Sequence, residues 1–254
     1  MRNVKLLVSY DGGAYAGWQV QDKSPTIQGK LEESLSKIAG HAVSLRGSGR
    51  TDAGVHAAAQ AANFRTGSAA PLKAFVRGAN SLLPPDISVL SAEEAAPDFD
   101  ARKSSLYKVY LYRIKNAEAR SAGTAGTSLW IAQELDVAAM DQAAGKLTGR
   151  HDFGSFRSSG CDSAHAVRFL NSVRVTKAGG STLEIEVVGK GFLRNMVRII
   201  AGTLIEVGLG KLNPMEFRAV IDSADRETAG PTAPAHGLTL LRVVYPASDG
   251  PRYP

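Results

Sequence analysis

The chain has 254 residues, of which 44% are hydrophobic and 21% charged, ordinary usage for a globular protein with one large domain or two small ones. Lys and Arg number 30 against 24 Asp and Glu, and the formal net charge of +6 favours a polyanionic partner. The single cysteine, Cys161, excludes an intrachain disulfide and a Cys-rich zinc site. The five histidines form no closely spaced pair, so we expect no metal.

Hydropathy argues against a membrane protein. No apolar run reaches the roughly 18 residues of a membrane-spanning helix. The N-terminus lacks the long apolar stretch and small-residue cleavage site of a signal peptide. We therefore expect a cytoplasmic protein.

The first half of the chain predicts four strands and two helices. Apolar runs bounded by turn residues indicate strands, whereas apolar residues at helical spacing after Thr26 and Pro71 indicate helices. The expected strands are 4–10, 43–45, 58–64 and 87–90, and the expected helices are 27–38 and 71–82.

The second half predicts a similar order. Residues 107–114 alternate as a strand, and Asp136 can cap a helix that runs to Leu147. A strand pair, a long helix, a short helix from Pro214 and a last strand follow, at 167–175, 182–188, 192–209 and 238–245.

Each half thus approximates β-α-β-β-α-β, the order of the ferredoxin-like or split-βαβ motif. We predict an α+β fold of two such halves, with antiparallel or mixed sheets, divided into 1–100 and 101–254. Residues 117–128 are small and polar, and form the best candidate for a linker or mobile loop.

The most concentrated polar signal is the glycine-rich loop 47–56, which lies between two predicted strands. It carries Arg50, Asp52 and His56 within seven residues, and its glycines permit close approach of a ligand. It is no P-loop, because no Gly-Lys-Ser/Thr follows. From spacing alone, the favoured interpretation is a turn in which Asp52 bonds its own backbone and Arg50 is exposed.

Residues 49–57, Gly-Arg-Thr-Asp-Ala-Gly-Val-His-Ala, resemble the active-site signature of the tRNA pseudouridine synthase A family, the TruA family. Other stretches also match the family in chain order, and these are 10–19, 99–102 with 110–112, 151–157 with 160–161, 192–198 and 237–246. Within the first of them, Gly13 departs from the threonine that the family often has at this position.

The resemblance implies isomerisation of uridine to pseudouridine on the 3′ side of the tRNA anticodon stem-loop, at tRNA positions 38–40. The N1–C1′ bond breaks and a C5–C1′ bond forms, which needs no cofactor. The family also implies a homodimer that binds tRNA and an active site in a central cleft between the two halves.

The same resemblance assigns roles to individual residues. Asp52 takes the place of the catalytic aspartate, whose carboxylate attacks either the sugar or the base. Arg198 would stand beside it and favour its charged form. Tyr110 would stack on the target uracil, Leu240 would line the uracil pocket, and Arg50 would occupy the place of the extruded base or bind the flanking phosphate. A strand tyrosine, a core leucine and an exposed loop arginine are the structural alternatives.

RNA binding outside the pocket is expected to be electrostatic. Residues 101–120 carry six cations against one anion, and Arg157 and Arg168 are the candidates at the rim. A solvated charged face is the alternative for either arginine, and for Arg194 the expectation is a solvated or phosphate-facing cation one helical turn before Arg198. His56 is expected to structure its loop, and Cys161 to take no part.

Two other functions stay open at this point. A non-catalytic RNA-binding or chaperone protein fits the basic composition, although Asp52, Tyr110 and Arg198 argue against it. A glycine-rich nucleotide-binding protein has less support, because the phosphate-binding lysine is missing.

Overall fold

A computed structural model describes residues 1–161 and 163–246. The chain forms two units, of which unit 1 contains Met1–Lys108 and the stretch from Leu240 onward, and unit 2 contains Val109–Thr239. Unit 1 is thus made of two separate stretches of the chain, and most of the last strand belongs to it. None of the helices in these described ranges is long and apolar enough to cross a membrane.

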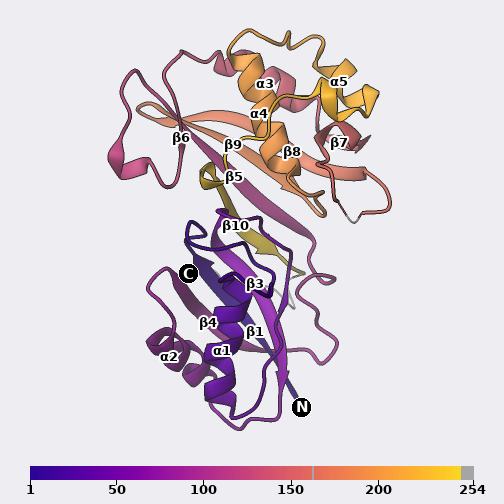
Figure 1. Ribbon diagram of the computed structural model, residues 1–254. Coiled ribbons are helices and arrows are strands. Elements are labelled where there is room, and N and C mark those ends of the chain that lie inside the picture. The colour runs from indigo at the N-terminus through magenta and orange to yellow at the C-terminus, as the bar shows by residue number, and fades with distance from the viewer. Residues whose placement is uncertain (162, 247–254) are drawn as a thin grey trace. The chain divides into compact units, whose positions relative to one another are not determined.

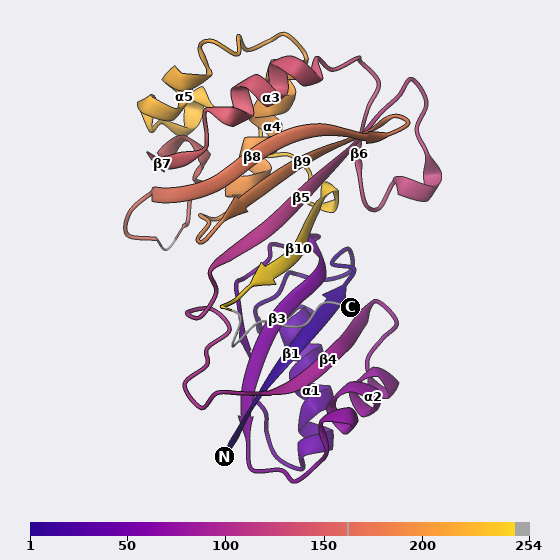
Figure 2. The same ribbon diagram turned by 180° about the vertical axis from the view of Figure 1, so that it is seen from behind.

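Unit 1 is a split-βαβ fold. Within it β4-β1-β3 are neighbours, β2 also pairs with β3, and all of these pairs are antiparallel. The order 4-1-3-2 is that of the predicted motif. Both helices cover one face of the sheet (Figures 1 and 2). Its elements are β1 (Arg2–Tyr10), α1 (Ile27–Ala39), β2 (Arg46–Gly47), β3 (His56–Thr66), α2 (Leu72–Leu82), β4 (Ile87–Ala95) and most of β10 (Leu238–Val244).

The helix signals read from the sequence act as expected in α1. The Thr26 hydroxyl accepts a hydrogen bond from the Gly29 amide at 3.3 Å, and Gly40 ends the helix with a φ of 75°. The apolar stripe of Ile27, Leu31 and Leu35 is fully buried.

The predicted strand 43–45 is wrong, because β2 covers only Arg46–Gly47. The backbone before it bonds to side chains of α1 instead of to a strand. The Val43 amide donates to the Ser36 hydroxyl at 2.9 Å, and the Leu45 amide donates to Glu32 Oε1 at 2.7 Å. Helix side chains therefore satisfy the backbone groups that a strand would have paired.

Unit 2 has a mixed sheet with the order β5-β9-β8-β7, and β6 pairs with β5 in parallel. Strands β5, β9 and β8 correspond to strands 1, 3 and 2 of the split-βαβ motif and lie in that order in the sheet. The predicted α+β class of two such halves is therefore confirmed. The three helices lie on one face of this sheet (Figures 1 and 2). Its elements are β5 (Tyr107–Asn116), β6 (Leu129–Ile131), α3 (Val137–Gly145), β7 (Gly149–Asp152), β8 (Val167–Gly179), β9 (Thr182–Gly189), α4 (Met196–Gly208) and α5 (Phe217–Ser223).

Helix α4 begins at Met196 and not at Phe192, as the sequence pattern predicted. Asn195 has a φ of 60°, which lies outside the helical region. Asn195 therefore reverses the chain direction immediately before the helix, and Arg194 lies outside α4.

The segment 230–237 packs tightly on α4 and β5. A Cβ added to Gly202 would lie 1.8 Å from the Pro231 carbonyl oxygen, and one added to Gly237 would lie 2.6 Å from Cζ of Tyr112. The Gly230 amide also donates to the Thr203 hydroxyl at 3.0 Å. Glycines on both partners thus let the segment lie directly against the helix.

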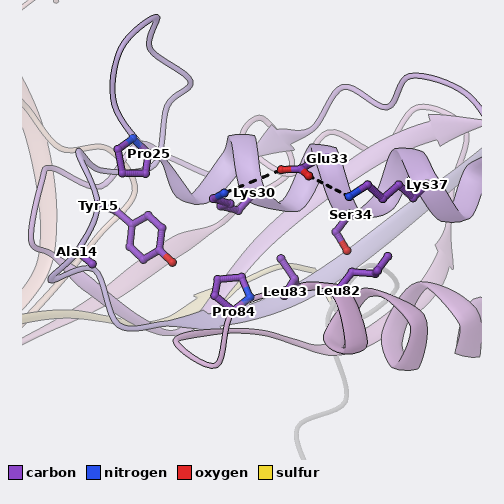
Figure 3. Close-up of a pocket in the computed structure, with 10 residues that line it drawn as sticks. All are labelled: Ala14, Tyr15, Pro25, Lys30, Glu33, Ser34, Lys37, Leu82, Leu83 and Pro84. Atoms are coloured by element: carbon purple, nitrogen blue, oxygen red, sulfur yellow. Dashed lines mark hydrogen bonds and ion pairs between the residues drawn. The ribbon is translucent and has the colours of Figure 1, made fainter.

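A groove of about 470 Å³ separates α1 from the end of α2 in unit 1 (Figure 3). The Glu33 carboxylate on its wall pairs with Lys37 at 2.9 Å and with Lys30 at 4.0 Å. The Tyr15 hydroxyl donates to Asp86 at 2.7 Å. These polar groups satisfy one another, and none of the residues predicted for the functional site lines the groove.

Replacing Gly202 with Ala is expected to destabilise the fold by about 1–3 kcal/mol or more, because the new methyl group overlaps a backbone carbonyl. Thermal and urea unfolding measure the effect. Gly145→Ala in α3 is the matched control, because a Cβ there meets no atom within 4 Å. Equal stability of the two variants would contradict the tight packing of the segment on α4.

Candidate functional site

The loop that carries Asp52 joins β2 to β3 and folds against the segment after β1. The Trp18 amide donates to the Thr51 carbonyl at 3.0 Å, and the Val55 amide donates to the Asp52 carbonyl at 3.1 Å. Asp52 is half-buried. A short turn thus presents this carboxylate at the boundary between the protein interior and solvent.

Two glycines of the facing segment make this close packing possible. Gly17 has a φ of 100°, and a Cβ on it would lie 2.6 Å from the Thr51 carbonyl oxygen. A Cβ on Gly12 would lie 2.0 Å from the Val55 carbonyl oxygen. A side chain at either position would displace the loop, so the observed position of Asp52 requires glycine at both.

A network of buried hydrogen bonds holds the same loop to β1 and β3. The Tyr10 and Thr51 hydroxyls are hydrogen-bonded at 2.9 Å. The Ser48 hydroxyl donates to Gln60 Oε1 at 2.5 Å, and Gln60 Nε2 donates to the Gly49 carbonyl at 3.0 Å. Burial raises the pKa of the Tyr10 hydroxyl well above its usual range, so this group stays a neutral hydrogen-bonding partner.

The two remaining polar residues of the loop have different surroundings. His56 is buried, and its Nδ1 lies 3.0 Å from Asp11 Oδ1 and accepts from the Gly12 amide at 3.2 Å. It joins the start of β3 to the turn after β1, which is a structural task. Arg50 is exposed, and its Nε donates to Gln19 Oε1 at 3.3 Å.

Arg198 lies in the first turn of α4 in unit 2 and is half-buried. Its Nε donates to the Ala233 carbonyl at 2.7 Å, and its Nη1 donates to Asn195 Oδ1 at 2.9 Å. The Ala233 amide returns a bond to the Arg198 carbonyl at 3.1 Å. Two of the five guanidinium donors therefore fix the side chain against its own unit.

Arg194 differs from its predicted position one helical turn before Arg198, because the chain there is not helical. Its Nη1 donates to the Gly160 carbonyl at 3.2 Å. Its own carbonyl accepts from the Ser158 amide at 3.4 Å. Arg194 thus holds the 158–160 turn against the approach to α4.

The aromatic candidates lie on β5. Tyr110 is 7% exposed, and its ring meets Phe192 edge-on with 5.0 Å between ring centroids. Tyr112 is fully buried and donates its hydroxyl to the Pro234 carbonyl at 2.9 Å. Tyr112 therefore takes the structural role expected of a strand tyrosine. Leu240, on β10, is also fully buried.

Arg157 and Arg168 lie on either side of Cys161 in the sequence. Arg157 Nη2 donates to the Cys161 carbonyl at 3.0 Å, and Arg168 Nη1 donates to the Val167 carbonyl at 2.7 Å. Burial works to raise the pKa of the Cys161 thiol, but the amides of Arg194 and Ser163 and the charge of Arg157 outweigh it and lower the pKa.

The predicted site residues are divided between the units. Unit 1 carries Arg50, Asp52 and Leu240, and unit 2 carries Tyr110, Arg157, Arg168 and Arg198. No three His, Cys, Asp or Glu side chains gather as metal ligands in the described ranges.

Four groups that hold the candidate residues were not predicted from the sequence, and these are Tyr10, Gln60, Asn195 and Ala233. Gln60 had a readable signal, because it is a polar residue within the otherwise apolar run 57–62. The contact with Ala233 is made by a backbone carbonyl, which leaves no signal in the sequence.

A family model described as "tRNA pseudouridine synthase" matches residues 6–102 and 143–246. All predicted site residues except Tyr110 fall within these two stretches. Among solved structures, a chain in "Crystal Structure of a Cbf5-Nop10-Gar1 Complex" covers 79% of this chain and 54% of its own length, with 11% identity and a TM-score of 0.31. That likeness is too distant to carry an argument.

Proteins named "tRNA pseudouridine synthase A" are similar over nearly the whole chain. The protein from Pelobacter propionicus is 47% identical over 96% of this chain and 100% of its own length. The protein from Myxococcus xanthus is 46% identical over 99% and 94%, and the one from Geotalea uraniireducens 48% over 96% and 100%. This chain belongs to the tRNA pseudouridine synthase family.

Proposed function

We propose that the protein isomerises uridine to pseudouridine in the anticodon stem-loop of tRNA, with Asp52 as the nucleophile. The observation that carries this proposal is the Asp52 loop itself, a half-buried carboxylate on a turn fixed by two glycines and a buried hydrogen-bond network. Such a fixed carboxylate suits a covalent step, because the nucleophile must meet its target in one orientation.

The proposed reaction keeps every atom of the base. Asp52 attacks the sugar or the base and forms a covalent bond to it. The N1–C1′ bond breaks, the base turns so that C5 bonds to C1′, and the bond to Asp52 breaks again. The proton on C5 leaves to solvent and N1 takes up a proton from solvent, so no oxidant, reductant or nucleotide energy is consumed. The residues assigned here therefore need no metal or cofactor.

The other candidates support that step. The target base is stacked in a stem and must be extruded, and exposed Arg50 suits the place that it leaves or the flanking phosphate. The Tyr110 ring would stack on the uracil, and Leu240 would line the uracil pocket. The Arg198 guanidinium has donors beyond those that bind Ala233 and Asn195, and would use them to favour the charged Asp52 carboxylate.

Binding of tRNA beyond the pocket would rest on phosphate contacts from basic residues, Arg157 and Arg168 among them. Each of the two arginines also donates to a nearby backbone carbonyl, Arg157 to that of Cys161 and Arg168 to that of Val167, which fixes their position on unit 2. The proposal includes a cytoplasmic homodimer that shares one tRNA between subunits.

Replacing Asp52 with Ala is expected to lower pseudouridine formation by more than about a thousandfold, because the covalent route loses its nucleophile. Binding of tRNA should change by less than about threefold, since one loop carboxylate adds little to a phosphate-dominated contact. Mapping of pseudouridine in tRNA transcripts and fluorescence anisotropy measure the two. Asp98→Ala removes an exposed carboxylate elsewhere in unit 1 and should behave as wild type. Retained turnover in Asp52→Ala would overturn the assignment, and binding without turnover in the wild type would favour the non-catalytic RNA-binding alternative.

Replacing Tyr10 with Phe removes the hydroxyl bonded to Thr51, so the Asp52 loop loses one support. We expect kcat to fall about threefold to tenfold with KM nearly unchanged, and stability to fall by about 1 kcal/mol. Tyr245→Phe is the matched control, because it removes a buried hydroxyl bonded to the Ala101 carbonyl at 2.6 Å, away from the loop. It should lose similar stability and keep its kcat. An equal loss of kcat in both variants would make the Tyr10 effect one of general stability.

Light scattering at micromolar protein concentration tests the homodimer. The expected mass is twice 26.8 kDa. A mass of one chain would contradict this part of the proposal and leave the chemistry of Asp52 untouched.

A further inference from the structure

Unit 2 carries a second groove, of about 640 Å³, where β7 pairs with β8 close to residues 190–191. Among the described residues that line it, three are cations, Arg150, Arg168 and Lys190, and none is a carboxylate. The other principal residues of its wall are Phe169 and His165. A lining of this kind attracts an anion and also offers an apolar contact.

The aromatic residue of the groove is unusually open to solvent. Phe169 is 53% exposed, although it lies on the long strand β8. It stands directly opposite Arg150 in the antiparallel register, so both side chains project from the same face of the sheet. A large exposed ring beside a cation provides a stacking surface next to a phosphate-binding group.

The cations of the groove have different tasks. Arg168 donates to the Val167 carbonyl on its own strand at 2.7 Å and to the His165 carbonyl, just before the strand, at 3.0 Å. The Arg150 guanidinium, by contrast, forms no hydrogen bond or ion pair with the rest of the described chain, and Arg150 is exposed. Asp152 is the nearby carboxylate on the same strand, and its Oδ1 accepts from the Gly154 amide at 2.8 Å.

We propose that this groove binds an unpaired nucleotide of the tRNA, outside the reacting uridine, with its base stacked on Phe169 and its phosphates on Arg150 and Lys190. The inference rests on the proposed function, because it names a further contact with the same substrate. A paired stem offers phosphates but hides the faces of its bases, so an exposed ring is useful only against an unstacked base. The described lining residues include no carboxylate, and this lining favours RNA over a basic protein partner.

The experiment measures binding of a tRNA transcript by fluorescence anisotropy over a series of salt concentrations. Phe169→Ala is expected to raise Kd about tenfold, as the loss of one stacked base does, with no change in the salt slope. Phe169→Trp keeps a stacking face and should bind within about twofold of wild type, whereas Phe169→Leu should bind like Phe169→Ala. Arg150→Ala should lower the slope of log K against log salt by about 0.7–0.9, the share of one phosphate.

Two control variants and one control RNA separate the groove from general surface effects. Lys177→Ala removes another exposed cation from β8, and Leu90→Ala removes another exposed apolar strand residue, in unit 1. A blunt RNA duplex of about 16 base pairs has no unpaired nucleotide, so Phe169→Ala should not weaken its binding. Circular dichroism verifies folding, and Arg150→Ala tests the groove independently of the Phe169 variants.

The stacking contact would be overturned if Phe169→Ala bound tRNA with the Kd of the wild type. It would also be overturned if Phe169→Leu and Phe169→Trp bound tRNA with equal Kd. A change in self-association by light scattering without a change in RNA binding would make the groove a protein contact and also overturn it. If the wild type forms no pseudouridine, the proposed function fails, while the anisotropy series still reports on the groove. If the wild type forms pseudouridine and Phe169→Ala binds normally, only this inference fails.

Discussion

The position of one short loop is the constraint on which the proposed chemistry depends. A turn that presents a carboxylate needs backbone freedom to form and rigidity to be useful. Different parts of the protein meet the two needs. The glycines that allow close contact lie on the facing segment, whereas side-chain hydrogen bonds from β1 and β3 restrict the motion of the loop. Tyr10 and Gln60 are buried strand residues, so the loop inherits the rigidity of the sheet.

Unit 2 applies a similar solution to a cation. The Arg198 guanidinium donates to a backbone carbonyl, which no single side-chain substitution can remove, and to the side-chain oxygen Oδ1 of Asn195. The carbonyl belongs to a segment fixed on α4 by Gly202 and on β5 by Tyr112. Precision at the guanidinium thus depends on packing many residues away in the sequence.

Local signals predicted most of the fold. Thr26 and Gly40 set the two ends of α1 through interactions within a few residues, so the sequence predicts where this helix begins and ends. The strand expected at 43–45 failed because Ser36 and Glu32 compete for its backbone amides, and that competition depends on tertiary structure. The start of α4 failed because Asn195 adopts a positive φ, which an apolar periodicity does not report. The site candidates came from a resemblance of motifs, whereas their supports were visible only once distant strands were brought together.

Asn195 shows how closely one residue can be constrained. Its side chain makes no capping bond to α4, since its amide oxygen accepts from Arg198 instead. Glycine would tolerate the backbone conformation but has no acceptor, and serine would offer a hydroxyl at the cost of an unfavourable φ. Aspartate would supply a charged acceptor and neutralise the guanidinium, drawing it away from any other anion. A substitution chosen to improve the start of the helix would therefore alter the electrostatics of Arg198, so the stability of α4 and the charge balance at Arg198 cannot be changed separately at this position.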